Sequence, residues 1–167
     1  MDGYRPPFWV RMDPALNCED AQLISLLDYW EGKKAGRVFP ARRDVDPIEI
    51  RHLLGVVVMI DIEQDPFRLR YRLLGTKITQ TMGRDNTGRY YDEIYGQELL
   101  SDIYKSFQWI LENRAPLRTY GEAFYEDRDF YDYETLNLPL SSDGETIDMI
   151  FGGIVFHSKS RLHGPPD

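Results

Sequence analysis

The hydrophobic pattern first predicts a helix. From Asn17 onward, apolar side chains recur at spacings of three and four residues, a spacing that places them along one face of an α-helix. This stripe consists of Leu23, Ile24, Leu26, Leu27 and Trp30. Asn17 and Asp20 can cap the start of the helix, and Gly32 and Gly36 mark its end.

Residues 47–54 carry the signature of a second, short helix. Asp46 is a natural N-cap, Pro47 stands at the first helical position, and Glu49 completes a capping box. Gly55 follows directly after the apolar residues. We therefore expect this helix to end at Leu54.

A period of two residues follows in the chain. In residues 67–74, Arg68, Arg70 and Arg72 alternate with apolar or aromatic side chains, which is typical of a half-buried antiparallel strand. Strands are predicted over residues 56–63, 67–74, 117–125, 130–140 and 146–156, and helices over 77–82 and 97–113. Asp143 and Gly144 indicate a tight turn between the last two strands.

This order of elements predicts an α+β fold. Strands that do not alternate regularly with helices favour a five-stranded antiparallel sheet, with helices packed on one face and an extra N-terminal helix. We expect one domain over residues 17–158, with an N-terminal tail at 1–16 and a C-terminal tail at 159–167.

Composition narrows the class of protein. The formal net charge of the 167 residues is −8, which disfavours direct binding of nucleic acid. No apolar stretch is long enough to span a membrane, and no apolar signal segment is present at the N-terminus, so we expect no membrane association and a cytoplasmic location. The single cysteine, Cys18, excludes an internal disulfide and a structural zinc site.

The local sequence resembles a known family. The segments that carry the resemblance are Leu26–Trp30 (LLDYW), Pro40–Pro47 (PARRDVDP), Ile50–Leu54 (IRHLL), Phe67–Thr76 (FRLRYRLLGT) and Gly83–Gly88 (GRDNTG). From about Asp20 to Phe156 they are similar to the short, stand-alone bacterial PAS-like domains found mainly in alphaproteobacteria. The resemblance implies a curved sheet whose concave face, closed by helices, can enclose a small molecule. It also implies an N-terminal helix of the kind that PAS proteins often use to dimerise.

Two cofactors familiar in this fold, flavin and haem, need a cysteine or a histidine at positions where this sequence has neither. A covalent flavin photoproduct needs a cysteine near the flavin ring, and Cys18 lies in the first predicted helix, outside the PAS core. A haem needs an axial ligand, usually histidine, but His52, His157 and His163 all fall outside the helical segment between the two groups of strands. We therefore predict no metal site and leave the cofactor unknown.

Two charged segments allow a functional and a structural interpretation. Arg68, Arg70 and Arg72 could bind an anionic partner, although balance by cross-strand acids is the favoured interpretation. The acidic residues 126–134 could be pictured as a Ca²⁺ site. They lack the spacing of a calcium-binding loop, and a solvated turn is favoured.

These patterns lead to a sensory or regulatory protein, not an enzyme, that acts through protein–protein contacts and by binding a small organic ligand. The expected partners are a second copy of the chain, as a homodimer, and a regulatory protein. Two alternatives stay open: a ligand-free structural adaptor, and a small acid–base enzyme with Asp148 as its only candidate catalytic group. The pocket candidates are Tyr71, Leu73, Ile78, Met82, Ile103, Phe107, Met149 and Phe151. The dimer-contact candidates are Leu23, Ile24, Leu27 and Trp30.

Overall fold

A six-stranded antiparallel sheet forms the centre of the computed structural model, which describes residues 10–125 and 129–158. The strands lie in the order β1-β4-β5-β6-β2-β3. Their bounds are β1 Arg11–Asp13, β2 Val57–Glu63, β3 Arg68–Leu74, β4 Leu117–Tyr125, β5 Asp129–Leu140 and β6 Met149–Ser158. The α+β class predicted from the sequence is confirmed.

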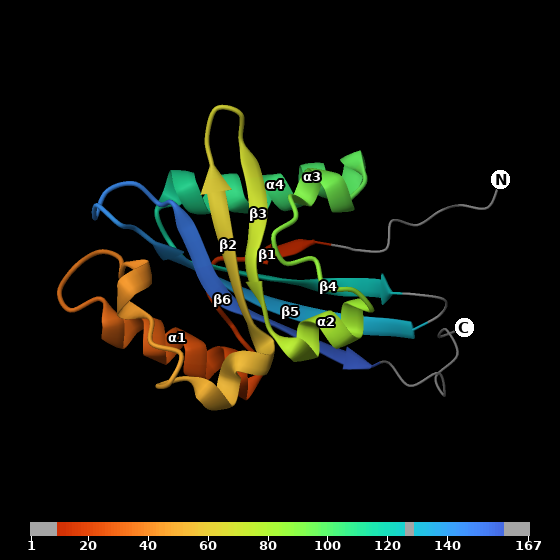
Figure 1. The fold of residues 1–167 in the computed structure, drawn as a ribbon, viewed down its shortest axis with the longest axis horizontal. Coiled ribbons are helices and arrows are strands. Elements are labelled where there is room, and N and C mark those ends of the chain that lie inside the picture. The colour runs from red at the N-terminus through yellow and green to blue at the C-terminus, as the bar shows by residue number, and fades with distance from the viewer. Residues whose placement is uncertain (1–9, 126–128, 159–167) are drawn as a thin grey trace.

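Helices cover both faces of this sheet. They are α1 Ala21–Lys33, α2 Thr76–Met82, α3 Tyr91–Ile94 and α4 Gln97–Asn113, with short 3-10 turns η1 Arg42–Asp44 and η2 Arg51–Val56. Figure 1 shows α1 on one side of the strands, and α3 and α4 on the other. The sheet therefore has an α1 face and an opposite face turned toward the remaining helices.

Close packing joins α1 to β6. A Cβ built on Gly153 would lie 2.7 Å from side-chain atoms of Leu23 and Leu26, so the absence of a side chain lets the helix approach the strand. Trp30 donates its indole N–H to the carbonyl oxygen of Pro139 in β5 at 2.8 Å. These contacts anchor the helix along much of its length.

The N-terminal segment corrects the predicted strand number. Residues 11–13, expected to belong to a tail, pair with β4 as a sixth strand. A strand of three residues is too short to show an alternating pattern, which explains why it was not predicted. Residues 1–9 and 159–167 of the predicted tails lie outside the described residues.

The predicted helix at residues 47–54 is also wrong. Asp46 accepts the backbone N–H of Ile48 as a cap would, but the chain continues through turns into η2. Glu49, expected to complete the capping box, instead forms an ion pair with Lys33 of α1 at 2.7 Å. The ion pair with Lys33 thus engages the Glu49 side chain that the predicted capping box needed.

Acids balance the arginine stripe of β3. Arg68 binds Asp92 at 2.7 Å, and Arg70 binds Asp61 at 2.8 Å. Arg72 lies 3.6 Å from the same Asp61. The favoured structural interpretation of the stripe fits this arrangement.

Candidate functional site

A small cavity of about 80 Å³ lies on the face of the sheet away from α1. Elements from both ends of the domain meet there, because β2 and β3 come before the helices α2 to α4 and β4 to β6 come after them. Its lining residues are Val10, Val58, Ile60, Tyr71, Met82, Tyr91, Tyr95, Leu99, Ile103, Ser106, Phe107, Thr119, Tyr133, Thr135, Asn137, Ile154 and Phe156. None of these described lining residues carries a charged side chain.

The strands contribute a polar wall to the cavity. Thr119 of β4 and Thr135 of β5 are cross-strand neighbours, and their hydroxyl oxygens lie 2.5 Å apart. Asn137 donates from Nδ2 to the Thr135 hydroxyl at 3.0 Å and to the carbonyl oxygen of Leu117 at 3.3 Å. A connected polar patch thus lies among apolar side chains.

Aromatic residues make up another part of the lining. The hydroxyls of Tyr71 and Tyr95 lie 2.6 Å apart, and the rings of Tyr71 and Tyr91 are 4.3 Å from centroid to centroid. Burial raises the pKa of Tyr95 well above its ordinary value, and the neighbouring Tyr71 raises it further. The phenol of Tyr95 is therefore neutral at physiological pH.

Half of the predicted pocket residues line this cavity. Tyr71, Met82, Ile103 and Phe107 do so. Leu73 and Ile78 do not, although Ile78 is fully buried in the core.

The placement of Met149 and Phe151 in the pocket was wrong. On β6 the cavity is lined by Ile154 and Phe156, so the odd-numbered positions Phe151 and Gly153 point to the other face. The ring of Phe151 contacts Tyr29 of α1 with centroids 6.2 Å apart. Met149 likewise does not line the cavity.

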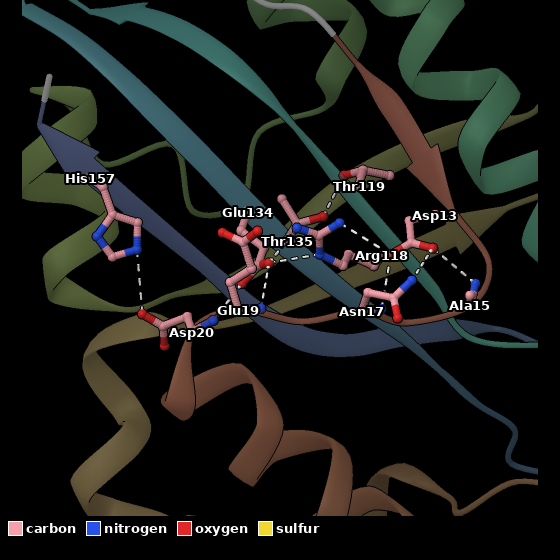
Figure 2. A network of polar contacts seen from close by, with 10 residues as sticks. All are labelled: Asp13, Ala15, Asn17, Glu19, Asp20, Arg118, Thr119, Glu134, Thr135 and His157. Atoms are coloured by element: carbon pink, nitrogen blue, oxygen red, sulfur yellow. Dashed lines mark hydrogen bonds and ion pairs between the residues drawn. The ribbon is translucent and has the colours of Figure 1, made fainter.

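On the α1 face, directly behind the polar wall, a buried ion network fastens the start of α1 to the sheet (Figure 2). Arg118 lies 2.7 Å from Glu134 and 3.1 Å from Asp13. Glu134 also accepts the backbone N–H groups of Glu19 and Asp20 at 2.9 and 3.0 Å. We call Asp13, Arg118 and Glu134 the α1 clamp.

The clamp is held in its charged form. Burial alone would raise the pKa of Glu134, but the N–H groups of Glu19 and Asp20 and the guanidinium of Arg118 outweigh it and keep that pKa below the ordinary 4.5. The same attraction keeps the pKa of Arg118 raised despite burial. The side chains of Arg118 and Glu134 are only 9% and 7% exposed, so this pair is shielded from water.

Sequence reasoning missed the clamp. Glu134 was assigned to a solvated acidic turn, yet its side chain is buried. Residues 126–128 of that turn lie outside the described residues. The position of Glu134 between Tyr133 and Thr135 in an alternating strand was the available signal, but only strand pairing brings it near Arg118.

The α1 residues proposed for a dimer contact divide into two groups. Leu23 and Trp30 are 0% and 2% exposed and belong to the protomer's own core, so including them in the contact was wrong. Ile24 is 43% exposed, and Leu27 is half-buried. Only the latter two side chains stay available for the predicted contact.

Of the remaining candidates, none within the described residues lines the cavity. Burial, followed by the charge of Glu134, raises the pKa of the Cys18 thiol to about 11. His52 and His157 are exposed, and His163 lies outside the described residues. Asp148 accepts hydrogen bonds from the backbone N–H and hydroxyl of Ser142 and does not line the cavity.

The described residues offer neither a metal site nor a membrane-spanning helix. Within residues 10–125 and 129–158, no group of His, Cys, Asp and Glu side chains is arranged to hold a metal ion. No helix in the same ranges combines the length and apolar character needed to cross a bilayer.

Comparison with known proteins agrees with this geometry. A family model described as "PAS domain" matches residues 19–155. Among solved structures, the chain is similar to an RNA-binding light-oxygen-voltage receptor, with a TM-score of 0.51 and 13% sequence identity over 90% of this chain. The chain spans only 39% of that receptor, and at this identity the likeness concerns the fold alone. No curated protein matches the sequence.

Proposed function

The chain belongs to the PAS domain family, and on that premise we propose that it is a sensory or regulatory domain that acts by binding. A small organic molecule enters the cavity, and its presence is passed to a protein partner or a second copy through α1. The observation that supports this proposal is the relation between the two faces of the sheet. Two residues of the clamp, Arg118 in β4 and Glu134 in β5, each directly precede a threonine of the polar wall.

The alternation of side chains connects the two sites. In β4, Arg118 belongs to the clamp and Thr119 to the cavity wall. In β5, Glu134 belongs to the clamp and Thr135 to the cavity wall. A ligand that shifts these strands therefore changes the position of the charges that fix the start of α1, and so favours one of two arrangements of the helix.

An exposed position on α1 supports the contact with a partner. Ile24 presents a large apolar side chain to solvent, whereas Leu23 and Leu26 beside it face the sheet. We expect a homodimer that uses this surface, in keeping with the sequence prediction. A cytoplasmic location and a bacterial origin stay predictions from the sequence.

Native mass spectrometry of the full chain, purified under mild conditions, tests the proposal. We expect a discrete mass in addition to the protein, and its loss in Ser106→Leu, because Ser106 lines the cavity and a larger side chain there fills it. Ser101→Leu is the matched control, since Ser101 is an exposed serine of the same helix. Bare wild-type protein, or a mass kept by Ser106→Leu, would count against ligand binding and favour the adaptor alternative.

A further inference from the structure

The two threonine hydroxyls of the cavity wall have two O–H protons, but the hydrogen bond between them uses only one. Thr119 and Thr135 carry one O–H each, and only one of these protons can lie between the two oxygens. The Thr135 oxygen also accepts from Asn137, which adds no acceptor for the second proton. Among the described residues no hydrogen bond from either hydroxyl to another acceptor occurs, so one O–H donor is left over whichever threonine provides it.

The amide of Asn137 leaves an acceptor beside that donor. Its orientation is fixed, because the carbonyl oxygen of Leu117 can only accept and therefore faces Nδ2. Both Nδ2 protons are then used, one on Leu117 and one on Thr135. Within residues 10–125 and 129–158, Oδ1 has no donor.

The position of this oxygen follows from its surroundings. Every fully enclosed side-chain polar atom of the described residues has a hydrogen-bond partner, so an Oδ1 without one borders open space. Asn137 is only 5% exposed and lines the cavity. The open space that Oδ1 meets is therefore the cavity.

We propose that the cavity takes a compact, neutral molecule whose edge carries an N–H donor beside a C=O acceptor, as in a small lactam, cyclic urea or imide. The spare threonine O–H donates to the carbonyl of such a molecule, and Asn137 Oδ1 accepts from its N–H. This inference rests on the ligand-binding role proposed above and specifies the chemical class of the ligand.

Size and charge restrict the class further. A volume of about 80 Å³ holds about six non-hydrogen atoms when each takes the roughly 10–15 Å³ that one water needs. No described lining residue is charged, so a carboxylate or an ammonium would lose its hydration without gaining an ion pair. Apolar side chains such as Ile103 and Phe107 contact the rest of a small ring.

Three five-membered rings of nearly equal size test the proposal on the full chain by NMR titration. They are 2-pyrrolidinone, which has both groups, cyclopentanone, which has only the acceptor, and cyclopentane, which has neither. We expect 2-pyrrolidinone to bind about tenfold more tightly than cyclopentanone. Its N–H donates to Asn137 Oδ1, whereas cyclopentanone has no donor and leaves this oxygen unsatisfied. In Asn137→Leu, which removes Oδ1, this preference should disappear or reverse.

Asn113→Leu is the matched control. It makes the same replacement at an exposed asparagine of α4 that does not line the cavity, so the preference for 2-pyrrolidinone should persist. Circular dichroism of both variants checks that they are folded.

The two proposals fail in different ways. Equal or tighter binding of cyclopentanone to the wild type would overturn the ligand class and leave ligand binding intact. The same holds if 2-pyrrolidinone does not bind while the purified protein retains a different molecule lost in Ser106→Leu. If none of the three rings binds and the purified protein carries no additional mass, both proposals are overturned.

Discussion

Glu134 Oε2 lies 2.7 Å from Nη2 of Arg118, in a pair shielded from water on the α1 face of the sheet. The two residues come from neighbouring strands, and each is followed in sequence by a threonine of the cavity wall. The pair also connects the sheet to the backbone at the start of α1 through the N–H groups that Glu134 accepts. In the proposed function, it is the point where a change in the cavity would reach the helix.

Removing one charge of this pair should destabilise the fold. Among the described residues, Glu134→Gln leaves the buried Arg118 with Asp13 as its acidic partner, and breaking a buried pair on one side typically costs about 3–5 kcal/mol. Urea denaturation measures the free energy of unfolding. Glu31→Gln is the control, because Glu31 pairs with Lys34 at the surface and its loss should cost less than about 1 kcal/mol. Equal losses in the two variants would contradict the clamp.

The clamp also predicts a dependence of stability on pH. The folded state lowers the pKa of Glu134 below 4.5, so the stability it contributes is present above pH 4.5 and is lost as the pH falls through the lower folded value. Unfolding measured between pH 7 and pH 3 should show this loss. Glu134→Gln should reduce the slope without abolishing it, because Asp143, whose pKa its hydrogen bonds lower to about 2, still contributes. An unchanged slope in Glu134→Gln would show that this carboxyl does not contribute.

A methyl group at Gly153 should push α1 away from β6. The added Cβ would meet Leu23 and Leu26 at 2.7 Å, and overpacking of this kind usually costs about 1–3 kcal/mol. Gly32→Ala is the opposite control, since nothing lies within 4 Å of a Cβ there and alanine favours the helix. We expect thermal unfolding at a lower temperature for Gly153→Ala and at an equal or higher one for Gly32→Ala. If Gly153→Ala unfolds like the wild type, the helix does not pack as closely as the structure shows.

Two neighbouring α1 substitutions separate folding from assembly. Leu23→Asp places a charge in the core and should unfold the domain, whereas Ile24→Asp changes a half-exposed side chain and should leave it folded. Size-exclusion chromatography with light scattering should give a dimer for the wild type and a monomer for Ile24→Asp. A monomeric wild type, or an Ile24→Asp variant that is still a dimer, would show that α1 is not the dimer contact.

Local patterns predicted most of the secondary structure. The residues of α1, α2, α4 and the five longer strands were foreseen within a few positions, because hydrophobic periodicity and caps such as Asp20 act over a few residues. The predicted helix at 47–54 failed where Glu49 binds Lys33 instead of the local backbone. Four of the eight predicted pocket residues line the cavity, among them Tyr71 on a cleanly alternating strand.

The sequence by itself determined the fold class, because burial of alternating and helical apolar faces leaves few arrangements for this order of elements. Only the tertiary structure decided which face each strand turns to the cavity, since a shift of one residue reverses every side chain. That choice sent Phe151 to α1 and Asn137 to the cavity. It also brought Glu134 to Arg118, 16 residues away in the chain, through the pairing of β4 with β5, a contact that no helical or alternating pattern contains.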